Sequence, residues 1–504
     1  MKELAIRDPR ELLSPPALTF IRDLARRFQP GLAGLLAERE RRQAGFDRGL
    51  PPGLPAGTEG IREGAWRVAP PPRSFMDRRV ELTGPPATAT VVQTLDSGAR
   101  AFLADFEDGL APTLDNLLDG QWQVLRAAGG PAAPMVRPRG LHLLEHRLPG
   151  AEPVPACLFD VGLFLFHGAR TLLERDQEPC LWLAKLEHHL EARWWNTVLE
   201  AMERRLDLPV GCIRTTMLIE TLPAAFQMEE LLFEQRERAV GMQFGQVNYL
   251  SSYIKTLRAD PRAMLPDRAA LHMDQPFLRA CSQLLVRTCH RRGTLALGGA
   301  GITGTASGRT EEAAPVAAQV RAEALREVLD GYDGTLVGDP ALVAVARAEF
   351  DLRMPGLNQA HRMPGPVRDQ DLLETPAGPR TEGGLRLELR VALRCLEAWL
   401  RGQGRAVLYG RLEDAAGVEF TRLHLWQWLS REAEVAGLGR LERPLFHCHV
   451  EDALHQVQAE VGEDAFQEGR YLEAADLLET AILLRDPPAF LTPAAEGLLA
   501  EIPR

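Results

Sequence analysis

Residues 214–245 read "RTTMLIETLPAAFQMEELLFEQRERAVGMQFG", and this stretch decides the fold. It opens with an apolar run typical of a buried strand and closes with a second such run, RAVGMQFG. Between the two runs, LPAAFQMEELLFEQRERA spaces its apolar residues as an amphipathic helix does. A strand, a helix and a second strand in this order predict a parallel βαβ unit.

The same alternation extends over residues 86–365. Amphipathic stretches there separate short apolar runs, which are RAFLADFED, APMVRPRG, CLWLAKLEHH, CIRTTMLIET, RAVGMQFG, TLALGGAG and GTLVGDP. Strands that alternate with helices over roughly 280 residues indicate a parallel α/β fold, and that length suits a (β/α)₈ barrel. A doubly wound open sheet is the competing fold, and it would bring only a few of the strand ends together.

The segments on either side of this region differ from it. Residues 1–85 begin with helical apolar spacing and then become rich in proline and glycine, which predicts helix followed by loops. Residues 366–504 contain amphipathic stretches such as TEGGLRLELRVALRCLEAWLRG and FTRLHLWQWLSREAEV. They predict a mainly helical C-terminal domain.

The composition is that of an ordinary soluble globular protein, with 45% hydrophobic residues, 25% charged residues and a net charge of −11. This charge argues against nucleic acid or an anionic membrane as a partner. The apolar runs fall short of the ~20 residues that span a bilayer, and the N-terminus MKELAIRDPRELL lacks the apolar core of a secretory signal. The seven scattered cysteines form no C-x-x-C pair, which favours reduced thiols and the cytoplasm.

Charged side chains stand at or just past the ends of several apolar runs. They are Asp105, Glu107, Arg139, Lys185, Glu187 and Glu220. In a barrel these strand ends converge on the face that carries the chemistry, so we expect a shared site. Simpler interpretations remain open. The acids suit solvated or capping groups, Arg139 suits a surface loop, and Glu220 suits the start of a helix capped by Thr221.

The sequence GAGITG, residues 299–304, matches the G-x-G-x-x-G fingerprint of dinucleotide sites. It lies late in the chain, and TASGRTEEAAP delays the helix that such a site requires. A nicotinamide cofactor is therefore disfavoured. Glycines that let the backbone approach a phosphate, or that line a barrel mouth, explain the motif as well.

Eight motifs resemble, in family order, those of malate synthase, the A-type enzyme of the glyoxylate bypass. They run from about residue 75 to the C-terminus and are DRRVELTGP, ADFEDGLAPTLDNLLDGQ, RPRGLHL, LFDVGLFLFHGARTLLE, AKLEHHLEARWWN, LIETLPAAFQMEELL, LVRTCHRRGTLALGG and YGRLEDAAGVEFTRLHLWQWL. The resemblance implies a (β/α)₈ barrel over 86–365, an N-terminal helical clasp over 1–85 and a C-terminal helical plug over 366–504. It further implies condensation of acetyl-CoA with glyoxylate and water, giving malate and CoA, with Mg²⁺ as cofactor and a monomer as the usual state.

The resemblance also assigns roles to individual residues. Asp414 falls at the catalytic base that removes a proton from the acetyl methyl group; its simpler interpretation is a first-turn acid of a helix. Arg139 falls at the arginine that stabilises the enolate oxygen, a task for a permanent cation. Glu220 falls at a ligand of the magnesium ion, which acts on the aldehyde as a Lewis acid.

Four further residues match family positions around these three. Asp105 and Glu107 resemble carboxylates that orient the arginine or metal-bound water. Lys185 and Glu187 match the family's P-K-M-E-S-H, with Ala184 in place of the proline.

The chain departs from the family at residues 241–249. The family reads approximately Gly-Leu-Asn-Cys-Gly-Arg-Trp-Asp-Tyr, and this chain reads Gly-Met-Gln-Phe-Gly-Gln-Val-Asn-Tyr. Asn248 therefore replaces the aspartate that is the second magnesium ligand. An amide carbonyl is still a hard oxygen donor but carries no charge, so we expect weaker magnesium binding.

Other departures lie in the loop AGITGTASGRTEE and in GTLVGDP, where Leu336 and Asp339 replace a tryptophan and a histidine. Asp339 could restore a carboxylate near the metal. Three functions stay open: a malate synthase with a loosened metal site, a related acyl-CoA lyase or synthase that uses another 2-oxo acid, and a catalytically impaired paralogue.

Overall fold

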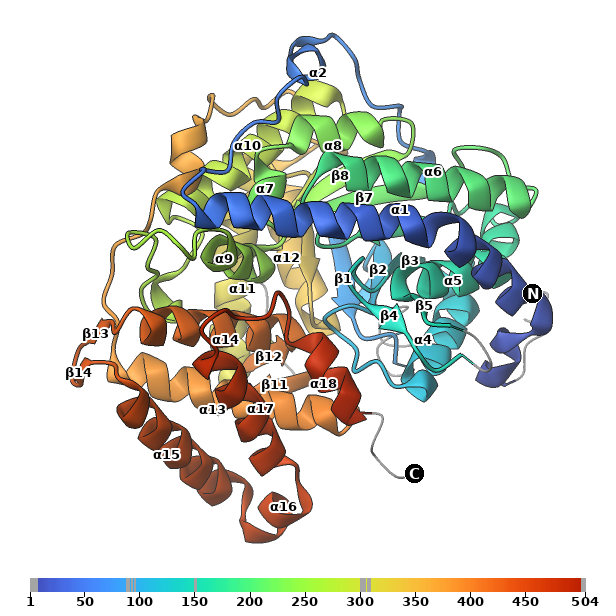
Figure 1. Cartoon of the computed structure of the whole chain (residues 1–504). Coiled ribbons are helices and arrows are strands. Elements are labelled where there is room, and N and C mark those ends of the chain that lie inside the picture. Colours follow the sequence, from blue (N-terminus) through green and yellow to red (C-terminus); the bar gives the residue numbers. More distant parts are fainter. Residues whose placement is uncertain are drawn as a thin grey trace.

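A parallel sheet of eight strands forms the centre of the molecule (Figure 1). The structure is a computed structural model and describes residues 8–499 apart from 88–90, 92–93, 95–96, 149–151, 300–304 and 306–309. The strands pair in the order β10-β1-β2-β3-β6-β7-β8-β9. Their bounds are β1 Val80–Gly84, β2 Ala101–Asp105, β3 Ala133–Arg137, β6 Cys180–Leu183, β7 Arg214–Ile219, β8 Ala239–Phe244, β9 Ala296–Leu297 and β10 Thr335–Val337.

The sheet closes on itself. Strand β1 pairs in parallel with both β10 and β2. At the other edge of the sheet, Leu297 of β9 forms a parallel bridge with Gly334, the residue before β10, and so joins the two edge strands. The predicted (β/α)₈ barrel is therefore confirmed, and the open doubly wound sheet is excluded. Closure brings the carboxyl ends of all eight strands to one rim.

The first barrel strand corrects the predicted domain boundary. Strand β1 precedes residue 86, the predicted start of the barrel, so its residues belong to the barrel rather than to the N-terminal segment. Its Glu81 is buried and breaks the apolar run that would have marked a strand. The guanidinium of Arg78 pairs with both carboxylate oxygens of Glu81, at 2.6 and 2.9 Å, and lies over the ring of Trp182.

Helices cover the outside of the barrel. They and the short pieces between them are α4 Leu114–Ala127, β4 Leu144–Glu145, β5 Val154–Pro155, α5 Ala156–Leu173, α6 His189–Arg205, α7 Leu222–Ala225, α8 Met228–Glu234, α9 Gln246–Thr256, η3 Arg268–Ala270, α10 Pro276–Arg292, α11 Thr310–Asp330, η4 Pro340–Leu342, α12 Val343–Arg353 and η5 Asp369–Leu373. Side chains cap several of them: Thr113 accepts from the N3 amide of α4, and Thr221 from that of α7.

Helix α5 is the one helix among the described residues that is long and apolar enough to cross a membrane. Its mean hydropathy is 1.4, but 72% of the helix is buried inside the protein. It packs against α1 and α4. A buried helix in the core of a protein meets the same criteria of length and composition, and α5 is buried as such a helix is.

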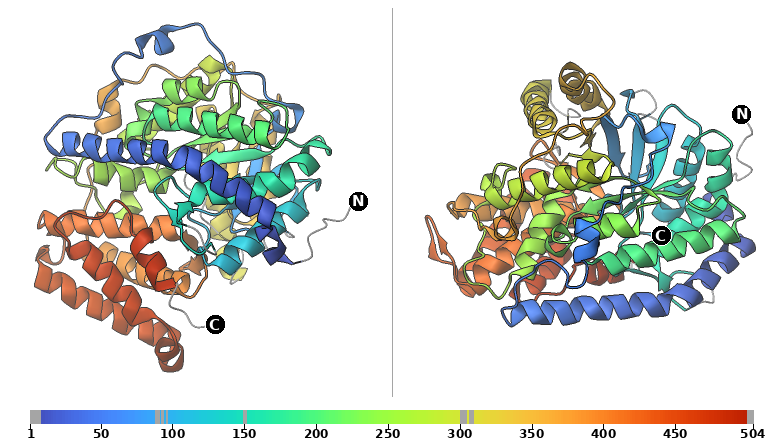
Figure 2. Two further views of the ribbon diagram at one scale, coloured as in Figure 1. Left: turned by 45° about the vertical axis from the view of Figure 1, so that its right-hand side comes forward. Right: turned by 90° about the horizontal axis from the view of Figure 1, so that it is seen from above.

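The N-terminal segment embraces the barrel from outside. It contains η1 Pro9–Leu13, the long helix α1 Pro15–Asp47, α2 Glu59–Glu63 and η2 Arg73–Phe75. Figures 1 and 2 show α1 running along the outside of the barrel, where it packs on α5 and α6. Arg39 of α1 donates to both carboxylate oxygens of the buried Glu191 on α6, at 2.8 and 2.7 Å. This is the predicted clasp.

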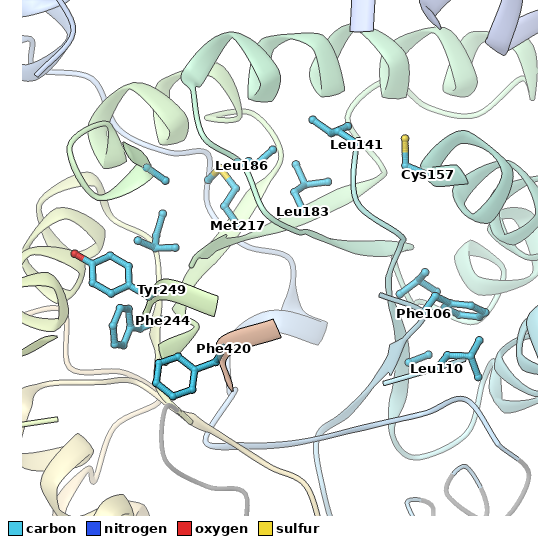
Figure 3. Close-up of a cluster of buried hydrophobic side chains, with 14 of the residues drawn as sticks. Phe106, Leu110, Leu141, Cys157, Leu183, Leu186, Met217, Phe244, Tyr249 and Phe420 are labelled. Carbon is cyan, nitrogen blue, oxygen red and sulfur yellow. The ribbon is translucent and has the colours of Figure 1, made fainter. Parts of the chain in front are cut away.

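The C-terminal domain lies against one side of the barrel (Figures 1 and 2). Its elements are α13 Glu382–Leu400, β11 Arg405–Leu408, β12 Arg411–Asp414, α14 Ala415–Ser430, β13 Glu434–Val435, β14 Gly439–Arg440, α15 Arg443–Val461, α16 Glu463–Glu468, α17 Tyr471–Leu483 and α18 Thr492–Leu499. Helix α14 packs on α9 of the barrel. Phe420 of α14 belongs to the same buried cluster as Phe244 and Tyr249, as Figure 3 shows.

Candidate active site

A cavity of about 160 Å³ lies where the strand ends meet the C-terminal domain. Its walls come from residues in or just past all eight barrel strands, including Trp182 of β6, and from the β11–β12 hairpin. The charged side chains that line it are Asp105, Asp108, Arg137, Glu220, Arg268, Arg405, Glu413 and Asp414. A small, charged chamber at this rim is where a barrel of this kind does its chemistry.

Arg137 is the cation at the centre of the cavity wall. It is the last residue of β3, and it contacts three carboxylates: Asp105 at 3.1 Å, Asp108 at 2.7 Å and Glu220 at 2.9 Å. Burial would lower its pKa, but these carboxylates hold the pKa well above its usual value. Arg137 is therefore a permanent cation, fixed by three carboxylates at the ends of two strands, β2 and β7.

Arg139 does not take the role predicted for it. Its guanidinium is 1% exposed and does not line the cavity. It donates to Asp160 at 2.8 Å and to Glu145 at 2.9 Å, and its backbone N–H also donates to Asp160. The strand has ended before Pro138, so the chain turns Arg139 outward to α5. The prediction is corrected, since Arg137 is the arginine in the cavity.

Asp414 faces the cavity from the C-terminal domain. It ends β12 and caps α14, where its side chain accepts from the backbone N–H of Ala416 at 3.1 Å. The β11–β12 hairpin sets Arg405 directly opposite Asp414, and their charged groups are 3.7 Å apart. Tyr409 and Gly410 both have positive φ angles, so the hairpin turn is the tight two-residue type that fixes this register.

Burial raises the pKa of the Asp414 carboxyl to about 7. The carboxylates of Asp108, Asp105 and Glu413 contribute to this rise, and the cation of Arg405 opposes it. A carboxyl whose pKa lies near neutral pH is suited to general base catalysis, because it accepts a proton readily and is still ionised in part.

Glu220 is held rigidly just past the end of β7. The backbone N–H of Lys185 donates to its Oε1 at 2.7 Å. Lys185 has a left-handed backbone, with φ of 50°, and this conformation costs a non-glycine residue about 1 kcal/mol. Opposite Glu220, a Cβ atom on Gly245 would stand 2.8 Å from its Cβ, so only glycine fits there.

Asn248 bridges two carboxylates. Its side-chain nitrogen donates to Asp108 at 2.8 Å and to Glu220 at 2.9 Å. It lies in the first turn of α9, directly after the end of β8. Among the described residues, no group of three or more His, Cys, Asp and Glu side chains is arranged to hold a metal ion. Two carboxylates with an amide still make an oxygen set that suits Mg²⁺, which otherwise keeps water and substrate oxygens.

Family comparisons agree with this geometry. Residues 134–375 match the model of the malate synthase TIM barrel domain, and residues 379–498 match the malate synthase C-terminal domain. The chain is 40% identical to malate synthase of Myxococcus xanthus over 98% of this chain and 95% of that protein.

The chain belongs to the malate synthase family.

Malate synthase A of Escherichia coli is 36% identical, over 97% of this chain and 96% of that protein. Among solved structures, the chain is similar to a Haloferax volcanii malate synthase pyruvate/acetyl-CoA ternary complex, with 15% identity, a TM-score of 0.49 and coverage of 79% and 98%. The family assignment does not depend on that likeness. The predicted family, enzyme class and barrel are confirmed, and the relatives' names give no support to another 2-oxo acid as acceptor.

Of the remaining predicted residues, Asp105 lies in the cavity wall and the others lie behind it. Asp105 lines the cavity and accepts from the backbone N–H of Glu107 at 3.0 Å. Glu107 does not line it; it accepts from Lys185 Nζ at 2.6 Å and from the backbone of Gly140. Glu187 lies further out, 3.6 Å from Arg39 and 3.4 Å from Lys255, so it joins the clasp to the barrel instead of touching the cavity.

Two adjacent acids have pKa values that are shifted in opposite directions. Burial would raise the pKa of Asp108, but Arg137 and Lys185 hold it well below its usual range. Burial raises the pKa of Glu107, against the opposing charge of Lys185. Asp108 is therefore an anion in the cavity, and Glu107 is the acid of the pair that protonates first. The residues that sequence reasoning missed are Asp108, Arg137 and Arg405.

The C-terminal domain is also held next to the site by Phe490. Its ring stacks on His142 with a centroid distance of 3.7 Å, and the ammonium groups of Lys255 and Lys185 lie 4.5 and 5.4 Å from the ring centroid. Burial and the neighbouring cations lower the pKa of His142 well below its usual value, so the stacked imidazole is neutral.

The other residues that differ from the family pattern lie partly in the cavity and partly outside it. Leu336 and Val247 line the cavity. Asp339 does not line it; it caps η4 and accepts from the hydroxyl of Thr305 at 2.7 Å, so it adds no carboxylate to the metal region. Most of GAGITG and of the loop after it lies outside the described residues.

Proposed function

We propose that this chain catalyses the condensation of acetyl-CoA with glyoxylate and water to give malate and CoA. The observation that carries the proposal is that Asp414, whose pKa is raised to about 7, and Arg137 line the same cavity. A base and a fixed cation are what an enolate-forming reaction requires. The two come from different domains, so the site exists only when the C-terminal domain is docked.

Asp414 removes a proton from the acetyl methyl group. Its carboxylate form does this work, so the reaction needs the group ionised. Arg137 stabilises the negative charge that then develops on the thioester oxygen, because its charge is permanent and its position is fixed. In the described part of the chain, its Nε is buried without a hydrogen-bond partner, so one donor of the guanidinium is unused.

Magnesium would be held at Glu220 and Asn248, next to Arg137. When bound, the ion supplies Lewis-acid polarisation of the glyoxylate aldehyde. Hard oxygen donors and an anionic surround suit it, and the neutral amide at 248 predicts weak binding.

Acetyl-CoA would enter through a second, larger cavity of about 710 Å³. Gln246, Val247, Arg268 and Glu413 line both cavities, so the two adjoin. Arg268, Arg326 and Arg411 line the larger cavity together with five carboxylic acids, and these arginines are the groups that would contact the phosphates of the ligand. We place the pantetheine arm and its phosphates there.

The test is CoA release from acetyl-CoA and glyoxylate, titrated with Mg²⁺. We expect turnover that depends on glyoxylate, and a loss of about 10²- to 10⁴-fold in Asp414→Asn, which keeps the shape of the side chain and removes the base. Asp452→Asn, on the surface of the same domain, is the control. A panel of other 2-oxo acids runs beside glyoxylate. Turnover that survives in Asp414→Asn, or none at any magnesium concentration, would remove the proposal.

The cytoplasmic location and the monomeric state stay predictions. Size-exclusion chromatography with light scattering measures the second, against a chain mass of 55.7 kDa.

A further inference from the structure

Two carboxylate oxygens converge on one point in the cavity. Asp108 Oδ2 and Glu220 Oε2 both accept from Asn248 Nδ2, at 2.8 and 2.9 Å. The same two oxygens are also close to one nitrogen of Arg137, at 2.7 and 2.9 Å. Two anions brought this close repel each other unless a positive group lies between them.

The orientation of the Asn248 amide follows from this arrangement. With its nitrogen toward the carboxylates, the amide donates two hydrogen bonds. Turned over, it would place its carbonyl oxygen against two anionic oxygens and would lose both hydrogen bonds. The NH₂ group of Asn248 thus stands where a cation would be attracted.

The local charge is unbalanced. Four buried carboxylates, Asp105, Glu107, Asp108 and Glu220, form one hydrogen-bonded cluster with two cations, Arg137 and Lys185. The excess of negative charge equals that of a divalent cation. The neutral amide of Asn248 compensates it only in part.

We propose that Asp108 is the second carboxylate ligand of the divalent cation, and that Asn248 closes the cation-free site and turns its amide over when the cation binds. This rests on the proposed function for the identity of the cation as Mg²⁺. Asp108 then supplies the charge that position 248 lacks. The amide must give up both hydrogen bonds before its oxygen can face the ion.

This inference predicts a different effect on Mg²⁺ binding for each of three variants. Asp108→Asn keeps the shape of the side chain but removes the ligand charge, so Mg²⁺ binding weakens. Asn248→Asp places a third carboxylate against Asp108 and Glu220, so the cation-free protein becomes less stable while Mg²⁺ binding tightens. Glu107→Gln is the matched control, since Glu107 belongs to the same cluster but does not line the cavity.

The experiment is Mg²⁺ binding by isothermal titration calorimetry without substrate, together with thermal denaturation in EDTA and in Mg²⁺. We expect Asp108→Asn to bind at least tenfold more weakly and Glu107→Gln to stay within about fivefold of the parent chain. Asn248→Asp should bind at least tenfold more tightly, with a lower Tm in EDTA and a larger rise on adding Mg²⁺.

Unchanged affinity in Asp108→Asn would overturn the inference. If that variant does not fold, Asn248→Asp decides alone: a Tm in EDTA equal to or above that of the parent chain would overturn it. Because no substrate is present, the result is independent of turnover. Metal binding as expected without CoA release would refute only the proposed function, and CoA release with metal binding insensitive to Asp108 would refute only this inference.

Discussion

Replacing Arg405 with glutamine tests whether the hairpin register tunes the catalytic base. Arg405 lies opposite Asp414, with their charged groups 3.7 Å apart, and it is the cation that opposes the rise in the pKa of Asp414. Glutamine keeps a polar side chain of similar length and removes the charge. The carboxylate form of Asp414 then loses its nearest stabilising cation.

The size of the effect follows from the distance. At this separation, two unit charges attract each other by about 1 kcal/mol in bulk water and by about 4 kcal/mol at an effective dielectric constant of 20. One pKa unit corresponds to about 1.4 kcal/mol. The pKa of Asp414 should therefore rise by about 1 to 3 units, from about 7 toward 8 to 10.

The assay is the pH dependence of kcat/KM for CoA release. The base works ionised, so activity in the parent chain should rise as the pH rises through about 7. In Arg405→Gln the same rise should occur at a higher pH, with activity at pH 7 reduced by about five- to five-hundredfold, because the ionised fraction of Asp414 falls. Arg386→Gln, which removes a charge from the surface of the same domain, is the control. An unmoved acid limb in Arg405→Gln would refute the reasoning.

Four further substitutions test the site. Arg139→Gln should lower the free energy of unfolding by about 3–5 kcal/mol in urea titrations, because Asp160 is left buried without its cation. Arg137→Lys should instead lower kcat at least tenfold, with a smaller loss of stability. The reverse pattern would restore Arg139 to the site. Gly245→Ala should displace Glu220, weaken Mg²⁺ binding in calorimetry and lower the free energy of unfolding by about 1–3 kcal/mol. Mg²⁺ affinity equal to that of the parent chain would contradict the displacement of Glu220. Phe490→Ala should lower the free energy of unfolding by about 1–2 kcal/mol, because stacking on His142 and the contacts to two ammonium groups are lost. A stability equal to that of the parent chain would show that the ring does not hold the domain in place.

Local patterns were enough for the fold and for part of the site. The alternation of apolar runs with amphipathic helices predicts the barrel, because strands buried on both faces leave continuous apolar runs in the sequence. Asp105 and Glu220 could be placed at the cavity from their positions at strand ends. The barrel strand that this pattern missed is β1, whose buried Glu81 is tolerated because Arg78 compensates its charge in the folded protein.

The sequence by itself thus determined the family, the barrel and the replacement of an acid by Asn248. Only the tertiary structure decided which arginine reaches the cavity, because the turn at Pro138 sends Arg139 outward to Asp160 and leaves Arg137 at the strand end. It also decided the surroundings of Asp108, whose partners Lys185 and Asn248 lie far from it along the chain, and the contact of Arg405 with Asp414, which depends on the register of the hairpin. Electrostatic interactions depend on distances in space, and the spacing of residues in a sequence does not fix those distances.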